Sequence, residues 1–115
     1  MDSDKNTIVQ KSYDLLKETV LTANGFPRSQ KFTLGDRLQN QATDLMDNYI
    51  RALYAPREAK RALLDEANIQ LEILRHYYRL AYDLGLYNSV RYKHFAEIIQ
   101  HIGRMTGGWI KSLGK

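Results

Sequence analysis

Apolar residues recur at intervals of three and four along most of the chain, which is the spacing of one face of an α-helix. Four such stripes can be traced, and they predict four helices. The first spans about residues 5–23, and the others begin after Thr33, Pro56 and near Ser89. No segment of useful length alternates between apolar and polar residues, so the sequence predicts no β-strand.

The helix boundaries are predicted from residues that start or stop helices. Gly25, followed by Phe-Pro, is expected to end the first helix in a left-handed turn. Thr33 is expected to cap the second helix, with Asp36 completing a capping box. Gly85 should end the third helix, and Ser89 should cap the fourth.

These stripes supply the expected core. Its positions are Leu34, Leu38, Ala42, Leu45, Tyr49 and Leu53 in the second helix; Ala59, Leu63, Ala67, Leu71, Leu74, Tyr78 and Ala81 in the third; and Phe95, Ile98, Ile102, Met105, Trp109 and Leu113 in the fourth. Four amphipathic helices joined by short loops predict an all-α protein, an up-down-up-down four-helix bundle. We expect a single domain over residues 1–115.

Two adjacent glycines interrupt the last stripe, in the segment RMTGGWIKS (104–112). Either the helix ends near Thr106 and a glycine caps it, or the helix continues through both. We favour continuation, because Met105, Trp109 and Leu113 keep one register across the glycines. Gly103 and Gly107 would then leave a narrow stripe on which another backbone can approach closely.

Composition narrows the class of protein. The chain is 43% hydrophobic and 26% charged, as expected for a globular domain. It has no cysteine, so neither a disulfide nor a thiolate metal site is possible. No apolar run suggests a signal peptide or a membrane span, and we expect a cytoplasmic protein with no membrane partner.

Charge is unevenly distributed along the chain. Residues 1–74 carry 10 basic and 11 acidic side chains (−1), whereas residues 75–115 carry 7 and 2 (+5), which together give the net charge of +4. The basic C-terminal part suggests contact with a polyanion such as nucleic acid, although a solvated face has the same composition. The candidate phosphate contacts are Arg75, Arg79, Arg91, Lys93, Arg104 and Lys111.

Four tyrosines lie near these cations: Tyr77, Tyr82, Tyr87 and Tyr92. They could stack on exposed bases, but tyrosine on a helical bundle is more often half-buried packing with a hydrated hydroxyl. We therefore favour the packing role for them.

Catalytic and metal-binding patterns are scarce. Glu72 and His76 lie four residues apart, as do Glu97 and His101, and antiparallel helices would bring the two pairs to similar heights. Di-iron bundles, however, use a spacing of three with inward projection, which favours two exposed Glu–His pairs. We predict no catalytic residue, no metal ligand and no cofactor.

Three segments carry a resemblance to a known family: FPRSQKFTLGDRLQNQA (26–42), LLDEANIQLEILRHYYRLAYDLG (63–85) and IGRMTGGWIKS (102–112). Together they resemble the accessory variability determinant (Avd) family of diversity-generating retroelements, over nearly the whole chain from about residue 7. The related intervening-sequence proteins of ribosomal RNA genes share the fold and part of the first motif.

The resemblance implies a homopentameric barrel without enzymatic activity, which binds a reverse transcriptase and RNA or DNA and supports mutagenic retrohoming. The net charge of +4 is mild for such a nucleic-acid binder, but five copies would gather about +20 (5 × 4) on one particle. We assign a contact with a partner or neighbouring subunit to Arg37, Gly103, Gly107 and Trp109; Arg37 could instead tie down its own loop.

Two other functions compete with this one. An intervening-sequence-type bundle would act with nucleic acid or the ribosome outside a retroelement. A small helical nuclease would need a histidine four to six residues after an arginine, and no arginine here has one.

Overall fold

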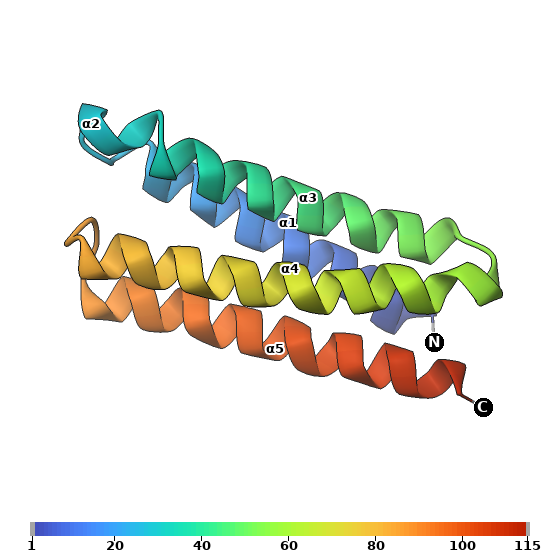
Figure 1. The fold of residues 1–115 in the computed structure, drawn as a ribbon. Coiled ribbons are helices and arrows are strands. Elements are labelled where there is room, and N and C mark those ends of the chain that lie inside the picture. Colours follow the sequence, from blue (N-terminus) through green and yellow to red (C-terminus); the bar gives the residue numbers. More distant parts are fainter. Residues whose placement is uncertain (1, 115) are drawn as a thin grey trace.

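The computed structural model describes residues 2–114, and the side chains of residues 7–114. This part of the chain contains four long helices, one short helix and no strand. They are α1 (Asp2–Ala23), α2 (Arg28–Lys31), α3 (Leu34–Tyr54), α4 (Arg57–Asp83) and α5 (Ser89–Leu113). Figure 1 shows the long helices side by side in one bundle, 47 Å in its longest dimension. The predicted all-α four-helix bundle is therefore confirmed.

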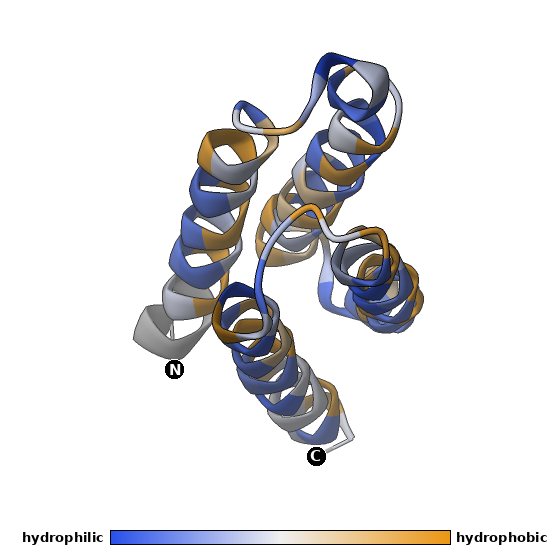
Figure 2. Cartoon of the chain, turned by 90° about the vertical axis from the view of Figure 1, so that its left-hand side faces the viewer, coloured by the Kyte–Doolittle hydropathy of each residue, from blue (hydrophilic) through white to orange (hydrophobic). Residues whose placement is uncertain are grey.

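The helices pack in the order in which they occur along the chain. α1 contacts α3, α3 contacts α4, α4 contacts α5, and α5 closes the bundle against α1. Short connections between consecutive helices make the neighbours antiparallel, which is the up-down-up-down arrangement. Viewed from one end, the apolar sides of the helices turn toward the common centre (Figure 2).

Most of the predicted core is buried, with a shift of one position on three helices. Ala52, Leu64 and Ile99 are fully buried, whereas the predicted Leu53, Leu63 and Ile98 are only half-buried. Thr106 takes the place expected for Met105, which is half-buried. In each case the buried stripe lies one residue beside the predicted one. Where two neighbouring residues both suit the core, the helical spacing alone does not decide which of them is buried.

The turn between α4 and α5 has the predicted glycine but a different cap. Gly85 has φ 75° and donates to the carbonyl of Tyr82, while Leu86 donates to the carbonyl of Ala81. This pair of bonds is the Schellman motif, and it ends α4 as predicted. The cap of α5 is Asn88, whose side-chain oxygen accepts from the Arg91 N–H at 2.9 Å. The predicted Ser89 cap is wrong by one residue.

The connection between α1 and α3 differs most from the prediction. It contains the short helix α2, which the sequence pattern did not indicate. Gly25 does not adopt a left-handed conformation. Thr33 precedes α3, but its side chain makes no cap bond and donates instead toward carbonyls of α2, so the predicted capping box with Asp36 is wrong.

The helix α5 continues without a break through Gly107 and Gly108. The capping interpretation of these glycines is therefore wrong, and the continuous-helix interpretation is confirmed. A Cβ atom added at either glycine would meet nothing within 4 Å, whereas one added at Gly103 would lie 3.9 Å from the Cδ1 of Leu71. Packing inside the chain thus does not require glycine at 107 or 108.

Two buried tyrosine–threonine pairs cross the core diagonally. The Tyr49 hydroxyl of α3 lies 2.6 Å from the Thr106 hydroxyl of α5. The Tyr78 hydroxyl of α4 is hydrogen-bonded to Thr19 of α1. Burial raises the pKa of Tyr49 to about 12, with the bond to Thr106 opposing that rise, and burial also raises the pKa of Tyr78. Each pair joins helices that are not neighbours around the bundle.

Candidate nucleic-acid and partner interfaces

Three of the predicted phosphate contacts lie along the outer face of α5. Lys93, Arg104 and Lys111 are spaced by eleven and seven residues, which places them on one side of the helix, and all three are exposed. None of the three forms an ion pair within the described part of the chain. We call these residues the α5 ridge. Its cations are available to an external anion.

The other predicted cations are exposed but already have acidic neighbours. Arg75 lies 3.4 Å from Glu72, and Arg79 lies 3.6 Å from Asp83, both on α4. The side chains in these two pairs are 44–69% exposed, so each pair adds little stability. Arg75 and Arg79 can therefore exchange a carboxylate for a phosphate at small cost.

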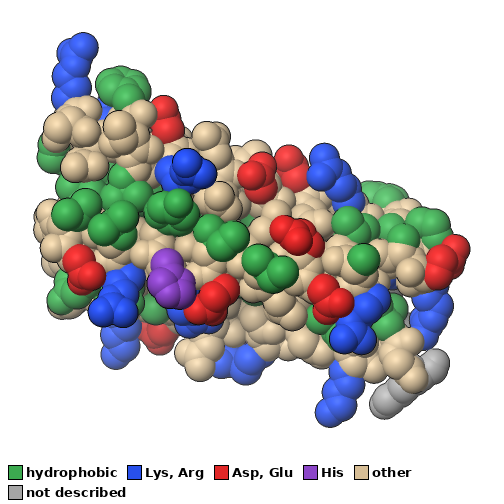
Figure 3. All heavy atoms as spheres, in the orientation of Figure 1, with side chains coloured by type: hydrophobic (Ala, Val, Ile, Leu, Met, Phe, Trp, Pro, Cys, Tyr) green, Lys and Arg blue, Asp and Glu red, His purple; other side chains and the backbone are tan. Residues whose placement is uncertain are grey.

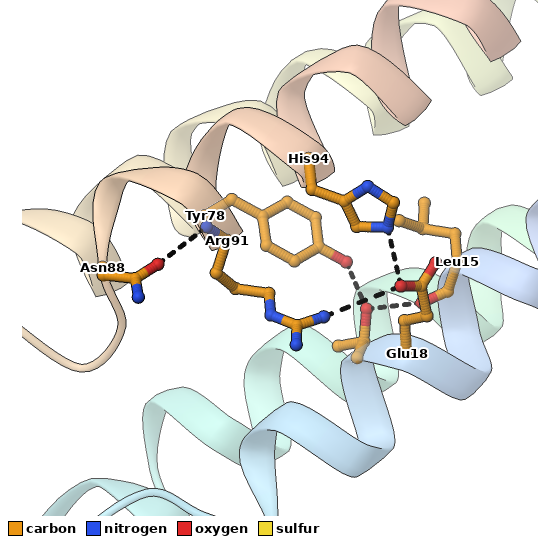
Figure 4. A network of polar contacts seen from close by, with 7 residues as sticks. Leu15, Glu18, Tyr78, Asn88, Arg91 and His94 are labelled. Atoms are coloured by element: carbon orange, nitrogen blue, oxygen red, sulfur yellow. Dashed lines mark hydrogen bonds and ion pairs between the residues drawn. The ribbon is translucent and has the colours of Figure 1, made fainter.

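Arg91 belongs to a different surface, the seam between α1 and α5. Its Nη1 lies 3.7 Å from Glu18 Oε1, and the Nε2 of His94 lies 2.7 Å from the same oxygen. Figure 4 shows Glu18 of α1 between these two side chains of α5. The sequence reasoning missed this cluster because Glu18 and His94 are 76 residues apart. The cluster ties α1 to α5, and it separates Arg91 from the α5 ridge.

The two Glu–His pairs do not form a metal site. The Nδ1 of His76 lies 3.8 Å from Glu72 Oε1 and 2.8 Å from the Glu72 carbonyl oxygen, on its own helix. Among the described residues no three His, Cys, Asp or Glu side chains are placed to hold a metal ion. Glu97 and His101 border a shallow groove together with Lys11 and His94. The structure therefore does not bring the two predicted pairs together.

The predicted partner contacts occupy different environments. Arg37 is exposed, and its guanidinium lies 5.8 Å from the Tyr77 ring centre, which joins α3 to α4. Trp109 is only 4% exposed and packs in the core of its own chain. The Lys60 ammonium lies 6.0 Å from the Trp109 ring centre and donates to the carbonyls at the end of α3.

The two glycines of α5 that were predicted at an interface differ in exposure. Gly107 is exposed and Gly103 is half-buried against α4. Their role at an interface stays a prediction.

An apolar stripe on the outside of α4 was not predicted. Ile69, Ile73 and Leu80 are 55%, 37% and 43% exposed. Their spacing of four and seven places them on one face, opposite the buried face of α4. Figure 3 shows apolar side chains gathered along this helix, with acidic and basic groups on both sides. We call these three residues the α4 stripe. The sequence could have revealed this stripe, because its three residues form a second apolar set at helical spacing on the same helix.

Two tyrosines form a further exposed feature at the end of the α4–α5 seam. The rings of Tyr82 and Tyr92 are stacked, with centroids 4.8 Å apart and planes 6° apart. Tyr82 is 36% exposed and Tyr92 is half-buried. The predicted packing role fits the other two tyrosines better: Tyr87 donates to the Tyr78 carbonyl, and Tyr77 packs under Arg37.

The fold and surface define a small basic four-helix-bundle protein with separate cationic and apolar faces. A family model described as bAvd-like matches residues 6–113. The chain therefore belongs to this family, as the resemblance to accessory variability determinants implied. The family is one of accessory, non-catalytic proteins. Comparison with curated proteins and with solved structures gave no match. No helix in the described residues is long and apolar enough to cross a membrane.

Proposed function

We propose that this protein is a non-catalytic accessory subunit of a diversity-generating retroelement. It binds the element's reverse transcriptase together with template RNA or cDNA, in the cytoplasm, and so supports mutagenic retrohoming. Family membership over residues 6–113 supports the class of function. The observation that carries the proposal at the level of residues is the α5 ridge, whose three cations have no acidic partner in the described chain.

Phosphate binding by the α5 ridge follows from elementary electrostatics. Exposed cations that release the counterions of a nucleic acid gain affinity without contacting any base. Lys93, Arg104 and Lys111 extend over eighteen residues of helix, which is about 27 Å at 1.5 Å per residue. Arg75 and Arg79 on the adjacent helix can add to this surface.

Salt-dependent binding tests this role. Replacing Lys93, Arg104 and Lys111 together by glutamine should weaken nucleic-acid binding and lower the slope of log affinity against log salt by about 2–3. The matched control replaces three exposed cations of the other helices, Lys17, Arg28 and Arg51, and so changes the net charge equally. Equal loss in both variants would mean that net charge, and not the α5 ridge, governs binding.

The proposal includes a homopentamer, and the α4 stripe supports contact between copies. Charged residues of both signs flank the stripe: Asp65 and Glu72 pair with Arg61 and Arg75 of the same helix, and Glu66 lies three residues before Ile69. A ring requires the α4 stripe of one copy to pack against a different surface of the next copy. A contact between two different surfaces is heterologous, and a closed heterologous contact forms a ring.

Native mass spectrometry measures the assembly directly. We expect a particle of about 67 kDa, five times the 13.4 kDa chain (5 × 13.4). Ile73→Glu should yield smaller species, whereas Val90→Glu, at a position that is 75% exposed on α5, should leave the particle intact. A wild-type monomer at micromolar concentration would refute the assembly.

An intervening-sequence-type role outside a retroelement is the alternative function. A reverse-transcriptase gene and a template/variable repeat pair next to this gene would favour the retroelement.

The proposal also requires that the purified protein neither cleaves nor copies RNA. Metal-dependent RNA cleavage that disappears in His76→Ala or His101→Ala would contradict the non-catalytic assignment.

A further inference from the structure

The stacked pair Tyr82–Tyr92 joins α4 to α5 at the surface of the molecule. The core beneath it is already closed by another aromatic stack, Tyr78 on Phe95, with centroids 4.5 Å apart. Neither hydroxyl of the exposed pair makes a hydrogen bond to another described residue. The pair instead presents aromatic surface to solvent at the end of the α4–α5 seam.

The location of the pair is fixed by the turn. Tyr82 lies in the last turn of α4, and Tyr92 in the first turn of α5, on opposite sides of the Gly85 Schellman motif. Because Asn88 caps α5 and Gly85 ends α4, the two ring-bearing turns are held in register. The stack is therefore formed before any ligand arrives.

Cations lie close in sequence to the stacked pair on both helices. Arg79 lies three residues before Tyr82 on α4, and Lys93 follows Tyr92 on α5. Arg79 has an exposed ion-pair partner, Asp83, which a phosphate can replace, and Lys93 has no ion-pair partner in the described chain. An aromatic platform beside cations is the combination by which proteins bind single strands, since bases stack on rings and phosphates contact cations.

We infer that Tyr82 and Tyr92 form a base-stacking platform for single-stranded nucleic acid, with Arg79 and Lys93 as its phosphate contacts. The inference rests on the proposed nucleic-acid function and adds strand selectivity to it. A duplex keeps its bases inside, so it can use the cations but not the platform. Single strands should therefore bind more tightly than duplexes at the same ionic strength.

Fluorescence anisotropy with the full chain tests the platform. The probes are a labelled single strand of about 16 nucleotides, the same strand without bases, and a duplex of equal length. For the wild type we expect the base-containing strand to bind about 5- to 150-fold more tightly than the abasic strand, which corresponds to 1–3 kcal/mol for one stacked base. This comparison needs no variant, so it remains informative if a substitution disturbs folding.

Three variants locate the effect. Tyr82→Leu removes the ring and should lose the advantage of the base-containing strand while duplex binding stays unchanged. Tyr82→Phe keeps the ring and should bind like the wild type. Tyr54→Leu is the control, because Tyr54 is 82% exposed at the end of α3, with no stacked partner among the described residues.

The possible failures are distinguishable. If the wild type binds neither single strand nor duplex, the proposed nucleic-acid function itself is wrong. If it binds both but Tyr82→Leu keeps the preference for bases, the platform is wrong and the function stands. If Tyr82→Leu loses only reverse-transcriptase binding in a pull-down, the pair is a protein contact and the inference is overturned.

Discussion

The two diagonal tyrosine–threonine pairs should respond asymmetrically to mutation. The Thr106 hydroxyl already donates its only proton to the Ile102 carbonyl, at 2.8 Å. In the bond to Tyr49, therefore, the tyrosine donates and the threonine accepts. The same reasoning applies to Tyr78, because Thr19 donates to the Leu15 carbonyl at 2.7 Å.

The size of the effect follows from which group loses its partner. Thr106→Val leaves the Tyr49 hydroxyl, in a fully buried side chain, without an acceptor, which should cost about 1–3 kcal/mol. Tyr49→Phe removes the donor, and Thr106 remains bonded to Ile102, so the cost should be about 0.5–1.5 kcal/mol. The double variant should cost less than the sum, since no unsatisfied donor remains.

Urea unfolding followed by circular dichroism measures all three variants, with Thr19→Val and Tyr78→Phe as an independent second set. The midpoint should shift without a change in slope if only stability is altered. A larger loss in Tyr49→Phe than in Thr106→Val would refute the assigned donor direction. Strict additivity in the double variant would show that the two hydroxyls do not interact energetically.

Four further outcomes can be checked by unfolding experiments. Burial of Tyr49 should contribute fully to stability up to about pH 10 and lose up to about 2.7 kcal/mol of that contribution toward pH 12, because unfolded Tyr49 ionises near 10 while the folded pKa is about 12. Tyr49→Phe should therefore reduce the loss of stability over this range. Gly107→Ala and Gly108→Ala should each raise the free energy of unfolding by about 0.5–1 kcal/mol, and a lower Tm would contradict this. Asn88→Ala should lower it by about 1 kcal/mol through the lost cap. Gly85→Ala should lower it by about 1–2 kcal/mol, since its φ of 75° is unfavourable for alanine.

The four long helices, their order and most core positions could be predicted from the sequence, because the periodicity of a helix can be read from its own residues without knowing what packs against it. The short helix α2 could not. The caps could not be placed to the residue. Asn88 and Ser89 are both good caps, and only the turn closed by Gly85 selects the first. Thr106 was missed in the core because its polar partner, Tyr49, is 57 residues away.

The candidate surfaces were predictable to different degrees. The α5 ridge follows from helical spacing alone, because residues seven and eleven apart, such as Lys93, Arg104 and Lys111, lie on one side of a helix. Arg91 was grouped with them by its sequence position, but its contact with Glu18 places it on the α1–α5 seam. The Tyr82–Tyr92 stack could not be found from the sequence, because it depends on how two helices align across a turn.

The order of the helices has a consequence for folding kinetics. Apart from α1 and α5, the long helices that pack side by side follow one another along the chain, so most contacts are local in sequence. Chains with such topology fold within microseconds to milliseconds. The closure of α5 on α1 brings distant segments together, as do the two diagonal tyrosine–threonine bonds, and the exposed Glu18–His94 bond spans the α1–α5 seam. In native-state hydrogen exchange, the outer amides of α1 should open before those of α3 and α4.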